Sequence, residues 1–205
     1  MLAFVGQFFT NFKTTGAILP SGGMLAKAMT RPVRRAHGPR RILEVGPGTG
    51  SFTKHLLEIL NPGDEFHIVE INNAFARHLE KRYLKSFRLD NPDITVILHC
   101  QPIEDAGIEG VFDFIICGLP FNNFPASLMR QIFRKMISLL TEGGKLTYFE
   151  YAGLRIFKAP IVGIKGREKL RRQRAIVKVL HRRHCGQRDF VLANVPPAYA
   201  LHLTG

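Results

Sequence analysis

The sequence predicts an α/β fold in which a mostly parallel sheet of seven strands carries helices on both faces. Three features support this prediction. Short apolar runs alternate with segments of helical periodicity, a glycine-rich turn follows the first run, and no helix separates the last two runs. Alternating strands and helices require right-handed crossovers, which make the strands parallel and cover both faces of the sheet. The directly connected last pair is expected to form an antiparallel hairpin.

The individual elements follow from the positions of these runs. Apolar runs bounded by turn residues predict strands at 41–46, 65–71, 94–100, 111–117, 145–151, 188–195 and 198–203. Helices are expected at 51–60, 73–87, 126–140 and 167–183. Glycine and proline pairs mark the turns, with Gly143-Gly144 before the fifth strand and Pro196-Pro197 inside the hairpin.

The composition limits the class of protein. A length of 205 residues with 45% hydrophobic content suits one globular domain with a single core. No run approaches the roughly 18 apolar residues of a membrane-spanning helix. The N-terminus has neither the basic region nor the cleavage site of a signal peptide. Three widely spaced cysteines predict neither a disulfide framework nor a zinc site, so we expect no metal and a reducing, cytoplasmic location.

The formal net charge of +13 is concentrated in two blocks. Residues 31–41 hold five basic side chains and no acid, and residues 155–183 hold eleven basic side chains against the single acid Glu168. Blocks of this kind attract polyanions, either nucleic acid or an anionic membrane surface. The candidates for contact with lipid phosphates are Arg31, Arg155, Lys158, Arg171 and Arg172.

The first 30 residues differ in character from the rest of the chain. Their apolar residues fall on one face of a helix, at Leu2, Val5, Phe8, Phe9 and Phe12. This spacing fits an amphipathic helix lying on a membrane surface. It fits equally a helix packed on the domain's own core, and the pattern alone leaves both interpretations open.

The strongest motif is the turn Glu44-Val45-Gly46-Pro47-Gly48-Thr49-Gly50, which follows the first strand. Its glycines permit unusual backbone angles and a close approach to a ligand. The spacing is G-x-G-x-G rather than the G-x-G-x-x-G of dinucleotide enzymes, and Glu44 is placed to face the amino group of a cationic sulfonium ligand. Glu70 ends the next strand, where a carboxylate accepts both hydroxyls of a ribose. Gln101 follows the third strand and is a candidate for reading an adenine edge.

With these motifs the sequence resembles the class I S-adenosylmethionine-dependent methyltransferases, and the resemblance covers residues 40–203. It implies a Rossmann-like sheet of seven strands with an antiparallel last strand, S-adenosylmethionine as cofactor and S-adenosylhomocysteine as product. By position, Glu44, Gly46, Gly48 and Gly50 line the methionine end of the cofactor. The resemblance assigns the ribose to Glu70 with Ile71, the adenine to Gln101, Pro102 and Ile103, and the reactive methyl to Cys117, Gly118, Leu119 and Pro120.

The methyl acceptor is less strongly indicated. Adenine N6- and rRNA dimethyltransferases carry Asn-Leu-Pro-Tyr where this chain has Gly118-Leu119-Pro120-Phe121, so the amide that holds the base is missing. A closer resemblance is to bacterial phospholipid N-methyltransferases, which convert phosphatidylethanolamine stepwise to phosphatidylcholine. It rests on three passages: Gly16-Ala17-Ile18-Leu19-Pro20-Ser21, Gly118-Leu119-Pro120 with Phe124-Pro125, and Asn194-Val195-Pro196-Pro197-Ala198.

This second resemblance implies a membrane-binding helix and lid at 1–30 and a methyltransferase domain at 31–205 with a basic insertion at about 153–185. The protein is then expected at the inner face of the cytoplasmic membrane, with a phospholipid as its partner and substrate. Nucleic-acid adenine methylation and ornithine-lipid N-methylation remain alternatives. Candidate residues at the acceptor are Gly118, Phe121 and Tyr148, with no general base assigned; Phe8, Phe9, Phe12, Ile18 and Ser21 are candidates for lipid contact.

Overall fold

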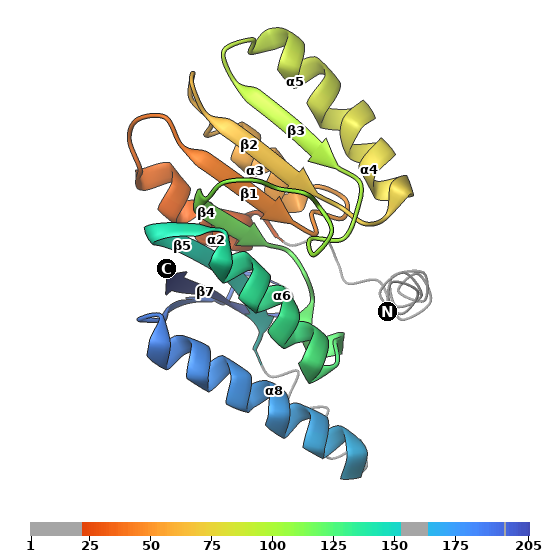
Figure 1. Cartoon of the computed structure of the whole chain (residues 1–205), viewed down its shortest axis with the longest axis vertical. Helices are drawn as coiled ribbons and strands as arrows, with labels where there is room; N and C mark the ends of the chain where they lie inside the picture. The colour runs from red at the N-terminus through yellow and green to blue at the C-terminus, as the bar shows by residue number, and fades with distance from the viewer. Residues whose placement is uncertain (1–21, 153–163, 195) are drawn as a thin grey trace.

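The computed structural model describes residues 22–152, 164–194 and 196–205. Within them, seven strands form one sheet in the order β3-β2-β1-β4-β5-β7-β6 (Figure 1). β1 to β5 pair in parallel, and β7 is antiparallel to both β5 and β6. The predicted seven-stranded sheet with its antiparallel last strand is confirmed. The strands are β1 (Arg41–Val45), β2 (Glu65–Val69), β3 (Thr95–His99), β4 (Phe112–Cys117), β5 (Leu140–Tyr151), β6 (Gln187–Val191) and β7 (Ala198–Thr204).

β5 differs from its prediction at its start. It begins at Leu140, which pairs with Phe112, and its register against β4 shifts between Phe112 and Phe114. Gly143 and Gly144 therefore lie inside the strand and do not precede it. A side chain at Gly144 would come within 3.1 Å of the Phe112 carbonyl oxygen, so the glycine permits the two strands to approach at this irregularity.

Helices cover both faces of the sheet, as predicted. On one face lie α6 (Ala126–Ser138) and α8 (Ile164–Arg183), which run side by side in Figure 1 and contribute buried residues such as Phe133 and Ile176 to one core cluster. The other face carries α2 (Gly23–Arg35), α3 (Ser51–Leu57), α4 (Asn73–Leu79) and α5 (Lys85–Asp90), with Leu56 and Leu79 in a second cluster.

α2 crosses the domain boundary that we expected after residue 30. Leu25, Met29 and Val33 are fully buried one turn apart, and α2 packs on α3 and the sheet. The Gly22 amide donates to Oδ1 of Asn194 at 2.9 Å, which ties the start of the helix to the turn that follows β6. Residues 22–30 therefore pack with the domain that follows them.

The helix predicted at 73–87 contains a π-helical turn, η2 (Glu80–Leu84), between α4 and α5. This turn brings Tyr83 toward the glycine-rich turn: a Cβ at Gly50 would lie 2.7 Å from the Tyr83 ring and 2.9 Å from Leu79. The wider turn therefore packs closely behind the motif that follows β1.

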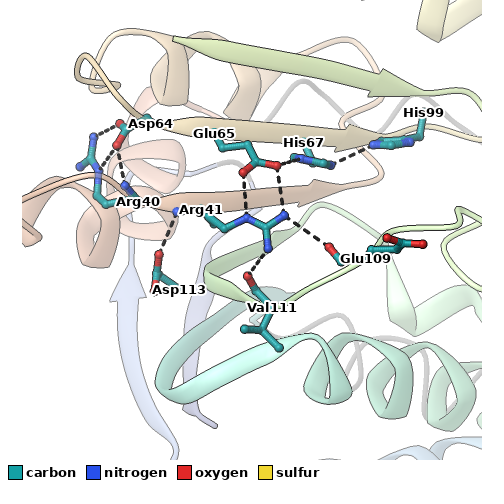
Figure 2. Close-up of polar contacts among 9 residues, drawn as sticks. All are labelled: Arg40, Arg41, Asp64, Glu65, His67, His99, Glu109, Val111 and Asp113. Atoms are coloured by element: carbon teal, nitrogen blue, oxygen red, sulfur yellow. Dashed lines mark hydrogen bonds and ion pairs between the residues drawn. The ribbon is translucent and has the colours of Figure 1, made fainter. Parts of the chain in front are cut away.

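Ion pairs fix the amino-terminal edge of the sheet (Figure 2). Arg40 is buried, pairs with the buried Asp64 and donates to the Val33 carbonyl at 2.7 Å. Arg41 pairs with Glu65 at 2.9 Å. These contacts are non-local, so a count of charges along the chain does not reveal them.

The basic block at 31–41 is therefore not a free cationic surface, and that expectation is corrected. Arg31 also has a partner, Asp189 of β6, at 2.8 Å. Arg34 and Arg35 are exposed, and no ion pair is found for them among the described residues.

Several sequence-predicted residues lie outside the described residues: Phe8, Phe9, Phe12, Ile18, Ser21, Arg155 and Lys158. None of the helices in the described ranges has the length and apolarity to cross a membrane.

Candidate cofactor site

A pocket opens where β1, β2 and β4 end, and it encloses about 350 Å³ of empty space, part of it solvent. The carboxyl ends of parallel strands are the usual ligand position in open α/β sheets. Seven predicted cofactor residues line it: Gly46, Glu70, Ile71, Gln101, Pro102, Ile103 and Leu119. Four further lining residues were not predicted, because their side chains are apolar or lie in a turn and give no sign of ligand contact: Val45, Val69, Glu104 and Ile132.

The glycine-rich turn needs its glycines for two reasons. Gly46, Gly48 and Gly50 all have positive φ angles, of 70°, 59° and 90°, in the region that side chains disfavour. Gly46 also contacts its neighbour closely, since a Cβ there would lie 2.3 Å from Cδ2 of Leu119. At Gly48 a Cβ would meet nothing within 4 Å, so this part of the turn is open.

Glu70 fits the expected ribose contact. Its side chain is buried, and its two oxygens accept hydrogen bonds from the amides of Gly48 at 3.0 Å and Asn72 at 2.8 Å. Burial raises the pKa of this carboxyl, whereas the backbone donors lower it. A carboxylate offers about four lone-pair positions, so acceptor capacity remains for a ribose hydroxyl.

Glu44 does not line the pocket, and the predicted contact with the methionine end is not seen. The side chain is fully buried behind the turn, where Oε2 accepts from the Thr53 hydroxyl at 2.7 Å. Oε1 is buried without a hydrogen-bond partner in the described part of the chain. Burial raises the pKa of Glu44 to about 8, and the Thr53 bond opposes that rise. Glu44 therefore lies beneath the turn with one acceptor unused.

Gly118 is fixed by its backbone contacts. Its amide donates to the Val45 carbonyl at 2.8 Å, and a Cβ on Gly118 would lie 2.4 Å from the Gly46 carbonyl oxygen. No side chain fits at this position without displacing the glycine-rich turn. The approach of two backbones therefore explains the glycine, which the sequence indicated only as a candidate residue at the acceptor.

Cys117 and Pro120, the other residues expected beside the methyl, flank the pocket without lining it. Cys117 is fully buried, and burial raises the pKa of its thiol to about 12. A thiol with this pKa stays protonated, so it supplies no base or nucleophile at neutral pH.

Phe121 and Tyr148 lie in the core, and their expected role as aromatic walls of the acceptor site is corrected. Phe121 stacks on Phe133 with ring centroids 4.5 Å apart, and its ring meets Tyr148 edge-on at 6.1 Å. Tyr148 is fully buried, with its hydroxyl 3.2 Å from Nε2 of His181. Burial in an aromatic cluster leaves neither ring face open to a substrate cation.

A series of polar contacts runs along the sheet toward the segment after β3 that lines the pocket (Figure 2). Glu65 contacts Nε2 of His67 at 2.5 Å, and Nδ1 of His67 lies 3.0 Å from Nε2 of His99. His99 ends β3, two residues before Gln101. Burial, and then the neighbouring His67, lower the pKa of His99.

Arg41 continues these polar contacts to residues 109–111, at the far end of the segment that follows β3. Its guanidinium donates to the carbonyls of Val111 at 2.9 Å and Glu109 at 3.3 Å, as Figure 2 shows. These polar contacts therefore fix residues 100–111 at both ends.

α8 presents its predicted cations outward. Arg171 and Arg172 are both exposed, and Arg172 pairs with Glu168 one turn away. On the inner side, Lys169 and Gln173 contact the segment that follows β4. Gln173 was not predicted as a functional residue, because a single glutamine in a basic helix gives no signal of burial.

A protein-family model described as a methyltransferase domain matches residues 43–146. An ornithine lipid N-methyltransferase from Singulisphaera acidiphila is 30% identical over 141 residues, which cover 69% of this chain and 72% of that protein. The chain belongs to the class I S-adenosylmethionine-dependent methyltransferases.

Solved structures agree with this methyltransferase fold. An O-methyltransferase from Bacillus cereus in complex with S-adenosylhomocysteine has a TM-score of 0.64 at 14% identity, covering 99% of this chain and 89% of that one. TomG, an O-methyltransferase from Streptomyces achromogenes in complex with S-adenosylmethionine, has a TM-score of 0.60 at 17% identity, covering 99% and 88%. S-adenosylmethionine is the cofactor of this methyltransferase, and the open turn at Gly48 and the remaining acceptor capacity of Glu70 fit it.

Proposed function

We propose that this methyltransferase transfers methyl groups from S-adenosylmethionine to the headgroup amine of a membrane lipid, with phosphatidylethanolamine and its partly methylated forms as substrates. The observation that carries the proposal is the outer face of α8. Arg171, Arg174, Lys178 and Arg182 recur at helical spacing and are all exposed. Glu168 is the single acid of the helix, so acidic side chains of α8 neutralise almost none of the positive charge on this face.

Such a face suits an anionic membrane surface, where each Lys or Arg contributes about 1 kcal/mol of attraction. α8 lies on the same side of the sheet as α6, and its inner side contacts the chain that leaves the pocket at Leu119 (Figure 1). A membrane bound along α8 would thus lie close to the methyl end of the pocket. The protein would act as a peripheral enzyme at the inner face of the cytoplasmic membrane.

For methyl transfer, the chain mainly has to position the cofactor and the acceptor amine. S-adenosylmethionine would supply a methyl group on a sulfonium, and a neutral lipid amine would receive it with S-adenosylhomocysteine as the leaving group. Ile103, Leu119 and Ile132 give the pocket an apolar wall that would exclude water, and Glu70 would hold the ribose. No side chain of the described residues is assigned as the base.

Ornithine lipid is a second candidate substrate, because the Singulisphaera relative carries the name ornithine lipid N-methyltransferase. Both lipids present a primary amine beside a membrane surface. An adenine in RNA fits less well, since the backbone contact at Gly118 excludes the amide side chain that would hold a base.

Transfer of labelled methyl from S-adenosylmethionine tests the proposal. The acceptors are anionic vesicles with phosphatidylethanolamine, the same vesicles with ornithine lipid, and structured RNA, and Gly46→Val serves as the inactive control. Label in phosphatidylethanolamine that migrates as mono-, di- and trimethylated lipid supports the proposal, and label in ornithine lipid alone selects the second candidate. Label in RNA alone would overturn both.

The role of α8 has its own test with the same vesicles. Reversing the charge of both Arg171 and Arg174 (R171E/R174E) should weaken vesicle binding at least about tenfold, because two attractive contacts with the anionic surface become repulsive. The matched control is K81E/K85E, which changes the net charge equally at exposed positions of η2 and α5 on the other face. Equal loss in both variants would show that net charge, and not α8, governs binding.

A further inference from the structure

α8 holds the main chain that leaves the cofactor pocket. Leu119 lines the pocket, and two residues later the chain forms a short helical turn, η3 (Phe121–Asn123), that leads through Phe124 to α6. Nε2 of Gln173 donates to the carbonyl oxygens of Phe121 at 3.1 Å and Phe124 at 2.8 Å. These partners lie 52 and 49 residues away along the chain.

The orientation of the Gln173 amide is determined by its partners. The residue is 1% exposed, and both of its contacts are carbonyl oxygens, so a flipped amide would place Oε1 against two other acceptors. Oε1 itself is buried and accepts no hydrogen bond within the described ranges. An unsatisfied buried oxygen is costly, and an apolar residue would avoid it. The two donated bonds are therefore what the glutamine contributes here.

A second contact from the same face of α8 supports this arrangement. Lys169 lies one turn before Gln173, and its Nζ donates to the Asn123 carbonyl at 3.0 Å. Three carbonyls within residues 121–124 thus accept hydrogen bonds from one helix. Core packing holds the Phe121 and Phe124 rings, but the hydrogen bonds determine how the peptide planes between them are turned.

We propose that Gln173 is a positioning residue, which sets the main chain of residues 121–124, and through it Leu119, for methyl transfer. The Phe121 amide donates to the Leu119 carbonyl at 3.0 Å, so a rotation in the turn reaches the pocket wall directly. Misplacement of about 1 Å lowers a rate up to a hundredfold when a reaction depends on alignment. The choice of acceptor for the kinetic test rests on the proposed lipid function, whereas the structural claim does not.

The test compares Gln173→Met with Ile176→Val in the full chain. Methionine keeps the length of the side chain and removes both hydrogen bonds, whereas Ile176→Val removes one methyl group from the same helix and leaves both bonds. We expect Gln173→Met to lower kcat for the lipid acceptor at least about tenfold, with KM for S-adenosylmethionine within about twofold of wild type. Ile176→Val should keep both values within about twofold of wild type.

Hydrogen exchange provides a readout that needs no acceptor. Amides of residues 121–124 should exchange at least about tenfold faster in Gln173→Met than in Ile176→Val, while β1 and β2 exchange alike in both. Equal exchange and equal kcat in the two variants would overturn the proposal. If wild type methylates none of the tested lipids, the proposed substrate fails, and the exchange experiment still decides the role of Gln173.

Discussion

The carboxyl of Glu44 accepts a hydrogen bond from the Thr53 hydroxyl at 2.7 Å, in a fully buried position behind the glycine-rich turn. The bond joins the end of β1 to the first turn of α3, the two elements that flank the motif. It satisfies one carboxyl oxygen and leaves the other without a partner among the described residues. The glycine-rich turn therefore lies on a buried acid, one of whose two oxygens has no hydrogen-bond partner among the described residues.

Glu44→Gln should change how stability depends on pH. Burial raises the pKa of Glu44 from 4.5 to about 8, so between these values the native state holds a proton that the unfolded state has lost. The contribution of this proton to the free energy of unfolding is fully present below pH 4.5. It falls by about 1.4 kcal/mol per pH unit as the pH rises, until the pKa of the folded state is reached. Glutamine stays neutral and still accepts from Thr53.

The measurement is urea unfolding of wild type and Glu44→Gln from pH 5 to 9. The unfolding free energy of the variant relative to wild type should rise up to about pH 8 and then level off. A difference that stays constant with pH would show that Glu44 is ionised in the native state.

Glu70→Gln should weaken binding of S-adenosylhomocysteine. One carbonyl oxygen replaces two carboxylate oxygens, so the side chain cannot serve both backbone amides and the ribose. The loss of one or two hydrogen bonds to a charged group corresponds to about 1.5–3 kcal/mol, or roughly ten- to a hundredfold in Kd.

Calorimetric titration with S-adenosylhomocysteine measures this effect. Glu109→Gln is the control, because it makes the same change of charge at an exposed position of the same segment, outside the pocket lining. An equal loss for both variants would indicate long-range attraction of the cofactor in place of a ribose contact.

Arg40→Met should destabilise the fold, although Arg40 belongs to a block that resembles a cationic surface in the sequence. Its partner Asp64 is buried and would be left as an uncompensated charge, which costs about 3–5 kcal/mol. Denaturant unfolding measures the loss. Arg34→Met, at an exposed position in the same block, should change stability by less than about 0.5 kcal/mol.

The double variant R40M/D64N separates the charge from the packing. The Arg40 and Asn61 amides donate to different oxygens of Asp64, and asparagine keeps one of these two acceptors while it removes the unpaired charge. The double variant should therefore be more stable than Arg40→Met alone. No recovery in the double variant would mean that packing of the Arg40 side chain, and not the unpaired Asp64, accounts for the loss.

The sequence predicted the features that are local along the chain. Apolar runs located the seven strands, and the wall of the pocket followed because Gly46, Glu70 and Gln101 each come directly after a strand. Parallel strands bring their carboxyl ends to one edge, so position along the chain was enough to place these residues together.

Features that depend on distant contacts were not predictable in this way. Phe121 and Tyr148 carry rings that suit either a core or a cation site, and only the packing of α6 and α8 decides for the core. The pairing of Arg40 with Asp64 requires β1 and β2 to be adjacent. Gln173 is polar in a basic helix, and its burial depends on a turn that lies about 50 residues earlier.

Gly118→Ala should weaken cofactor binding through the glycine-rich turn. The added Cβ would lie 2.4 Å from the Gly46 carbonyl oxygen, and a backbone atom cannot move aside as a side chain does. The turn must shift, and overpacking of this kind costs about 1–3 kcal/mol of stability. Because Gly46 lines the pocket, we expect Kd for S-adenosylhomocysteine to rise at least about tenfold, which is about 1.4 kcal/mol.

Gly143→Ala is the matched control for this prediction. Gly143 has a φ of 75° and nothing within 4 Å of a Cβ, so alanine there costs about 1–2 kcal/mol through backbone strain alone. Its stability loss should be comparable, but it lies toward the start of β5, away from the pocket, and Kd should stay within about twofold of wild type. Similar Kd values for the two variants would mean that the contact between Gly118 and Gly46 does not shape the cofactor turn.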